Sequence, residues 1–74
     1  MHTSSLVVEK ARHLAAAGHH AEVVEFLGAR AESELQDSPT LALLYGTAHA
    51  RLGRHDEGLR WLDRALDEAR KQDE

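Results

Sequence analysis

Hydrophobic residues recur at helical spacing in four stretches of the chain, and glycine or proline residues separate these stretches. Apolar residues three and four positions apart line one face of an α-helix, whereas a half-buried strand alternates with a period of two. The pattern therefore predicts an all-α fold of four helices, over about residues 5–17, 20–36, 39–52 and 55–70, with no strand. The apolar stripes are Val7, Ala11 and Leu14; Val23 or Val24, Leu27, Ala31 and Leu35; Leu41, Leu44, Tyr45, Ala48 and Leu52; and Leu59, Leu62, Leu66 and Ala69.

Local signals mark several of the helix ends. Ser38 is a good N-cap, and Pro39 is tolerated at the first helical position because the N–H that it lacks would have no partner there. Gly18 and Gly53 follow the first and third stretches and suit C-terminal stops, since glycine adopts the left-handed conformation without a Cβ penalty. Gly28 falls inside the second predicted helix, at a cost of about 1 kcal/mol relative to alanine. Because the loops are short, we expect successive helices to be antiparallel neighbours.

The four stretches form two copies of one unit. Gly18 and Gly53 are 35 residues apart, and the residues around them match in kind. Residues 21–27 of the first copy align with residues 56–62 of the second. A helix-turn-helix unit that recurs at this interval is typical of a solenoid array.

The pattern resembles the tetratricopeptide repeat (TPR) family. In the second copy the matching positions are Gly46, Gly53, Leu62 and Ala65, with His55 where an aromatic residue is usual and Gly58 where alanine is preferred. In the first copy they are Ala11, Leu14, Gly18, His20, Val23 and Leu27, with Arg30 where the family prefers alanine. The proline that usually closes a repeat is missing from both copies. The resemblance implies one TPR-like domain over residues 1–74, with repeat one at about 5–37 and repeat two at about 38–72.

The resemblance also implies a binding face on the first helix of each repeat. In TPR proteins this concave face binds a peptide or a partner helix, and two arginines beside an apolar floor would suit an acidic or carboxylate-bearing peptide. The carboxylate clamp of chaperone-binding members needs lysine and asparagine where this chain has Val8 and Arg12, so we do not expect chaperone-tail binding. The implied partner-binding residues are Val8, Arg12, Ala15, Leu43, Thr47, Ala50 and Arg51.

Composition narrows the function classes further. The chain has 74 residues, no cysteine and a net charge of −4, which disfavours a disulfide-stapled protein, a cysteine-based zinc module and a nucleic-acid binder. No apolar run approaches the roughly 20 residues that span a bilayer. Residues 1–5 lack the basic start and apolar core of a signal peptide. We therefore expect a cytoplasmic protein without a membrane or nucleic-acid partner.

The short array suggests self-association. Solenoids generally need about three repeats and polar end caps, whereas this chain has two repeats. On the last helix, Leu59 and Trp61 widen the apolar face, although Trp61 could equally pack in the core. We therefore expect a homo-oligomer whose contact includes Leu59 and Trp61. Two functions stay open: a module that binds a peptide or partner protein, and a self-associating assembly protein without a peptide ligand.

The titratable residues do not form a recognisable catalytic or metal site. The sequence contains no nucleophile elbow, phosphate-binding loop or carboxylate pair in a catalytic context. The histidines are numerous, but no pair has the i,i+4 spacing of a helical zinc site. We therefore expect no enzyme activity, no cofactor and no metal. The histidines considered as ligands are His13, His19, His20, His49 and His55.

Overall fold

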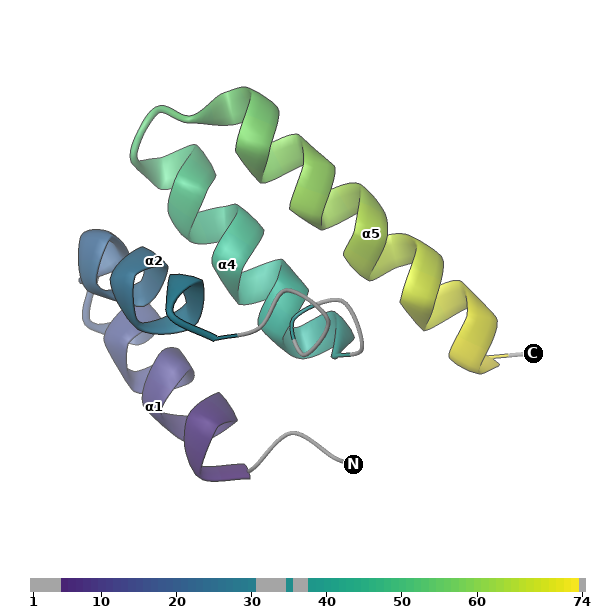
Figure 1. Ribbon diagram of the computed structural model, residues 1–74, viewed down its shortest axis with the longest axis horizontal. Coiled ribbons are helices and arrows are strands. Elements are labelled where there is room, and N and C mark those ends of the chain that lie inside the picture. Colours follow the sequence, from purple (N-terminus) through teal and green to yellow (C-terminus); the bar gives the residue numbers. More distant parts are fainter. Residues whose placement is uncertain (1–4, 31–34, 36–37, 74) are drawn as a thin grey trace.

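The computed structural model describes residues 5–30, 35 and 38–73, and this part of the chain forms four α-helices and no strand. The helices are α1 (Ser5–Ala16), α2 (His20–Gly28), α4 (Pro39–Arg51) and α5 (His55–Asp73). Helix α4 contacts each of the other three, and α1 also contacts α2. Figure 1 shows α4 between α5 on one side and α1 with α2 on the other. For the described residues, the prediction of an all-helical fold is confirmed.

The same turn follows α1 and α4. Gly18 and Gly53 have left-handed φ angles of +80° and +86°. In each turn the N–H of the residue after the glycine donates to a carbonyl in the last helical turn: His19 to Leu14 at 2.9 Å and Arg54 to His49 at 2.8 Å. The glycine N–H donates to the next carbonyl along, that of Ala15 or Ala50, at 3.1 Å. This pair of bonds defines the Schellman motif, and it confirms both glycines as helix stops.

The start of α4 is the predicted one. The Ser38 hydroxyl accepts a hydrogen bond from the Leu41 N–H at 3.3 Å, and Pro39 is the first helical residue. The cap satisfies one of the backbone donors that have no partner within the helix. Helix α5 begins at His55, as expected, and continues past the predicted end at Arg70 to Asp73.

Helix α2 is shorter than the periodicity predicted. It ends at Gly28, and Ala29 and Arg30 are not helical, so the prediction of one continuous helix to Gln36 is wrong. Glycine has a low helix propensity, and Tyr45 of α4 occupies the space beside this one: a Cβ on Gly28 would lie 3.3 Å from the Tyr45 Oη. Leu35 is helical and buried, while residues 31–34 and 36–37 lie outside the described part.

The core lies along α4. Leu41 and Ala48 of α4 are buried against residues that α1 and α2 contribute, and Trp61 and Ala65 close the core from α5. Burial of these apolar side chains contributes about 25 cal/mol per Å² of apolar area removed from water. The buried apolar residues are Ala11, Val23, Leu27, Leu35, Leu41, Ala42, Ala48, Trp61 and Ala65.

Helices α4 and α5 meet backbone to backbone. A Cβ on Gly46 would lie 2.9 Å from the Gly58 carbonyl oxygen, and a Cβ on Gly58 would lie 2.8 Å from that of Gly46. Neither position therefore has room for a side chain. This contact turns the face of α5 that carries Gly58, Trp61 and Ala65 toward α4.

The face of α5 that packs is not the predicted stripe. Leu59 and Leu66 are 58% and 62% exposed, whereas Trp61 is only 6% exposed. The glycine contact selects the neighbouring face, so the leucines lie beside the α4 interface instead of within it. Trp61 is a core residue, which corrects its assignment to a self-association surface. Only Leu59 of the two predicted residues is available there.

Candidate interaction surfaces

A groove of about 410 Å³ lies between the C-terminal half of α1 and one side of α4, and the start of α2 closes one end. Helix periodicity explains its floor, because Leu43, Thr47 and Arg51 recur every fourth residue along α4. The Gly18 turn brings the start of α2 to the same place. The described lining residues are Ala15, Ala16, Gly18, His20, Leu43, Leu44, Thr47, Ala48 and Arg51.

Four of the seven predicted partner-binding residues line this groove: Ala15, Leu43, Thr47 and Arg51. The other three lie elsewhere. Val8 is half-buried against the core, and Arg12 is exposed on α1, one helical turn before Ala15. Ala50 faces α5, because a Cβ on Gly58 would lie 3.1 Å from the Ala50 Cβ.

Five groove residues were not predicted. Ala16, Gly18 and His20 come from the turn between α1 and α2, and Leu44 and Ala48 come from α4. The repeat pattern assigns turn residues to the connection and places Leu44 and Ala48 on the core stripe. No sequence signal shows that these residues also border a groove, because that depends on how α4 lies against α1.

The titratable side chains that line the groove are basic. Arg51 is exposed at its edge, and His20 is half-buried at its end. None of the described lining residues is acidic. The floor is apolar and the charged edge is basic, so the groove suits an apolar segment that carries a carboxylate.

A second groove, of about 400 Å³, lies between the start of α4 and the C-terminal half of α5. No charged side chain lines it among the described residues. Leu62, Leu66 and Ala69 form its α5 side, and Leu59 continues the same row toward the turn. We call Leu59, Leu62, Leu66 and Ala69 the leucine seam. Pro39, Thr40, Leu43 and Ala65 complete the lining.

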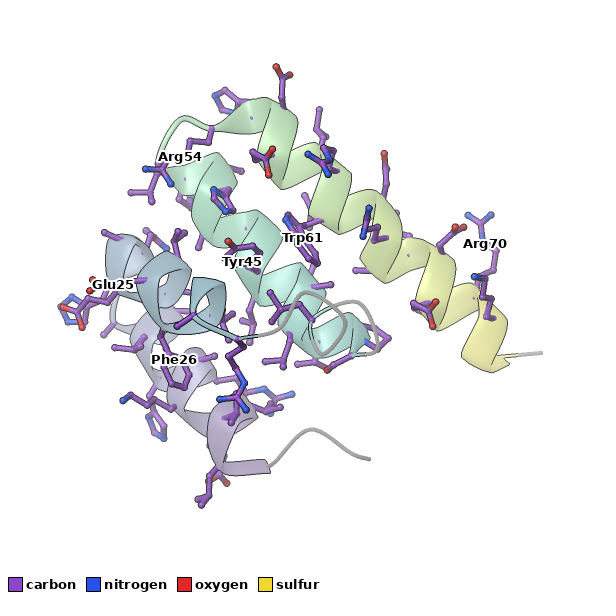
Figure 2. All side chains as sticks on the ribbon, viewed as in Figure 1. Glu25, Phe26, Tyr45, Arg54, Trp61 and Arg70 are labelled. Carbon is purple, nitrogen blue, oxygen red and sulfur yellow. The ribbon has the colours of Figure 1, made fainter. Side chains whose placement is uncertain are left out.

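A buried aromatic cluster joins α4 to α5. The ring of Tyr45 meets those of His49 and Trp61 edge to face, with centroid distances of 4.6 and 5.1 Å. Figure 2 shows Tyr45 and Trp61 directed toward each other from the two helices. Such edge-to-face contacts stabilise aromatic pairs beyond their buried area. The cluster is therefore part of the core and not of either groove.

His49 is the buried polar member of this cluster. It is 6% exposed, and neither ring nitrogen has a hydrogen-bond partner among the described residues. Burial lowers the pKa of His49 below its ordinary value of 6.5, Arg54 lowers it further, and Glu57 acts in the opposite direction. Protonation of this ring therefore opposes folding.

The histidines considered as metal ligands do not form a metal site in the described part of the chain. His13, His19 and His55 are exposed, so His55 does not fill a packed position in its turn. Within the described part of the chain, no three histidine or carboxylate side chains are placed to hold a metal ion. In that same part, no helix is both long enough and apolar enough to cross a membrane.

Comparisons of this chain with models of protein families, with curated proteins and with solved structures give no match. The resemblance to the TPR family therefore depends on the residues quoted above and stays a prediction.

Proposed function

We propose that the chain is a protein–protein interaction module, built as two TPR-like helix-turn-helix repeats, which binds a peptide or partner helix between α1 and α4. The observation that carries this proposal is the groove, which the first helices of the two proposed repeats border together. Its role is binding, without bond chemistry.

The two turns support the repeat interpretation. Three residues separate the two helices at each turn, and both turns use a left-handed glycine with the same two hydrogen bonds. Two pairs of positions 35 residues apart are also alike in burial: Ala11 and Gly46 are both buried, as are Val23 and Gly58. Repeat one would cover about residues 5–37 and repeat two about residues 38–72.

The groove chemistry favours an acidic peptide. A guanidinium binds a carboxylate through charge-assisted hydrogen bonds, which are stronger than neutral ones. Arg51 would hold the carboxylate, and Leu43, Thr47 and Ala15 would contact an apolar side chain beside it. Arg12, exposed on the same helix as Ala15, would extend the basic edge toward the start of α1.

Selection from a displayed library of random peptides tests the proposal. We expect enriched peptides to combine apolar residues with aspartate or glutamate. Arg51→Ala should weaken their binding by about tenfold, because it removes one charged hydrogen-bond partner. Arg54→Ala is the matched control, since Arg54 is exposed on a turn and does not line the groove.

Amide chemical shifts show where a selected peptide binds. The largest changes should fall at Ala15, Thr47 and Arg51. A library that yields no binder contradicts the proposal. Binders that perturb other residues, or that bind Arg51→Ala as tightly as the original chain, contradict it as well.

A further inference from the structure

The leucine seam leaves large apolar side chains in contact with solvent. Leu59 and Leu66 are each more than half exposed, and Leu62 and Ala69 continue the same face at intervals of three, four and three residues. This interval is that of the a and d positions of a coiled coil. The adjoining groove has no charged lining residue among those described. The face therefore has the pattern of a helix–helix contact.

The first helix pair shows what kind of element fits such a face. Leu27 precedes Leu62 by 35 residues and is fully buried, and α4 contacts both α1 and α2. The corresponding face of that pair therefore already accepts a helix. Helix dimensions are uniform, so a helix is the occupant that the seam and its groove fit.

We propose that the leucine seam binds α5 of a second copy of this chain, in antiparallel orientation about a twofold axis. Reversing one helix against the other places Leu59 opposite Ala69 of the second copy and Leu62 opposite its Leu66. The twofold axis generates each of these two residue pairs a second time, so both copies use the same residues, as an isologous contact requires. The inference goes beyond peptide binding and does not depend on it.

Charge complementarity selects the antiparallel orientation. Asp56 and Arg70 lie two heptads apart on the side of the seam away from α4. The first turn of α5 is acidic and the last is basic, with Arg70 and Lys71. Arg70 projects from the outer side of the helix, away from α4 (Figure 2). An antiparallel pair places this basic end beside the acidic end of the second copy, whereas a parallel pair places like charges together.

Helix α1 of a second copy fits the seam less well. The exposed side chains along α1 include Glu9, Lys10, Arg12 and His13. Docking this surface into an uncharged groove would remove charged groups from water without partners, which is costly. A head-to-tail stack is therefore disfavoured relative to the symmetric pair.

Sedimentation equilibrium of the full chain over a range of concentrations tests the pairing. We expect a monomer–dimer equilibrium, and Leu66→Glu should raise the dimer Kd by at least about tenfold, because it places a charge at the centre of the contact. Leu6→Glu is the matched control, since Leu6 is 73% exposed on α1. Circular dichroism should show both variants folded, because both leucines are exposed.

A charge exchange tests the orientation. Asp56→Arg and Arg70→Asp should each weaken the dimer, because this register brings Arg70 beside Asp56 of the second copy and each variant creates a like-charged contact there. The double variant should recover most of the affinity, since it restores opposite charges in exchanged positions. Double-variant affinity no better than that of either single variant contradicts the antiparallel arrangement.

Disulfide trapping gives an independent measure, because the chain contains no cysteine. A mixture of the Leu59→Cys and Ala69→Cys variants should oxidise mainly to the mixed dimer. Dimers that link position 59 to position 59 would overturn the antiparallel geometry. A chain that stays monomeric at all concentrations, or a dimer that Leu66→Glu leaves intact, would overturn the proposal.

Discussion

The helix pair α1–α2 and the helix pair α4–α5 begin with the same turn and then diverge. In both pairs a left-handed glycine lies two residues after the end of the first helix, and the second helix begins two residues after that glycine. The second helix of the first pair has 9 residues, whereas that of the second pair has 19. At the position where α2 ends in Gly28, α5 carries Asp63 and continues. A shared turn thus sets where a helix starts, but not how far it runs.

The two helix pairs also differ in the size of the residues at corresponding buried positions. In α1–α2 the corresponding positions are Ala11 and Val23, which are fully buried side chains. In α4–α5 they are Gly46 and Gly58, whose backbones touch. At corresponding sequence positions, one helix pair therefore packs through buried side chains and the other through direct backbone contact.

The aromatic residues at matching positions differ in burial. Trp61 is buried against Tyr45, with the Arg64 guanidinium 5.5 Å from its ring centroid. Phe26, 35 residues earlier, is half-buried under the Lys10 ammonium, which lies 4.7 Å from the ring centroid. The second pair therefore has the stronger aromatic core. The predictions below test how far the two pairs differ, from the largest effect to the smallest.

The largest effect should come from the aromatic position. Trp61→Ala should lower the free energy of unfolding by about 4 kcal/mol, because it leaves a cavity between α4 and α5. Phe26→Ala should cost about half as much, since that residue is only partly buried. Urea titration of both variants measures the difference. Equal losses would mean that the two pairs have equivalent cores.

The second-largest loss of stability should come from replacing Gly58, where α5 contacts the backbone of α4. Gly58→Val copies the first pair, where Val23 stands, but its Cβ would overlap the Gly46 carbonyl. We expect a loss of about 3 kcal/mol, near the upper end of overpacking costs. Gly28→Ala is the control, because the atom nearest to its Cβ position is the Tyr45 hydroxyl oxygen of a side chain, at 3.3 Å, and not a backbone atom. Thermal unfolding that shows a milder effect at Gly58 than at Gly28 would contradict the backbone contact.

Replacing the buried histidine should stabilise the chain. His49→Leu introduces the residue that the first pair has at Leu14, and it removes two ring nitrogens that lack partners among the described residues. We expect a gain of about 1–2 kcal/mol at neutral pH, comparable to the cost of burying an unpaired polar group. Chemical denaturation measures it. A loss of stability would show that the imidazole has a favourable contact that leucine cannot replace.

The same variant tests the pH dependence. Because the pKa of His49 is lowered in the folded state, the unfolded chain binds more protons as the pH falls below about 6.5. Titration of His49 therefore costs no stability well above that pH, and stability is lost as the pH falls from about 6.5 toward the lowered, folded-state pKa. Stability measured between pH 7 and 5 should fall less steeply in His49→Leu than in the original chain. Parallel curves would refute this assignment.

The two turn glycines should give the smallest and most nearly equal effects. Gly18→Ala and Gly53→Ala each force alanine into the left-handed region, which costs about 1 kcal/mol. Apart from the glycine and its two chain neighbours, no described heavy atom lies within 4 Å of the Cβ position at either glycine, so the cost is conformational. Differential scanning calorimetry should show similar decreases in Tm. Clearly unequal decreases would argue against equivalent turns.

Local chemistry made much of the helical framework predictable. Ser38 with Pro39 starts α4, and Gly18 and Gly53 end α1 and α4, because caps and left-handed glycines act within a few residues of the sequence. The end of α2 was missed. The apolar periodicity continues past Gly28, while the structure breaks the helix where Tyr45 of another helix lies.

The candidate site was predictable only in part, for the same reason. The resemblance to the TPR family placed Leu43, Thr47 and Arg51 on one binding face, and these three residues line the same groove. It could not show that Ala50 faces α5 or that His20 borders the groove. Those placements depend on how separate helices approach each other, which a single stretch of sequence does not encode.

The sequence by itself determined that the described chain is helical, where its four helices begin, and that one turn is used twice. Tertiary structure decided which face of α5 is buried. The leucine seam has the stronger apolar pattern, yet the contact between Gly46 and Gly58 turns Trp61 inward and leaves Leu59 and Leu66 exposed. Helix signals act through local hydrogen bonds and backbone sterics, whereas the choice of buried face depends on how closely two backbones can approach.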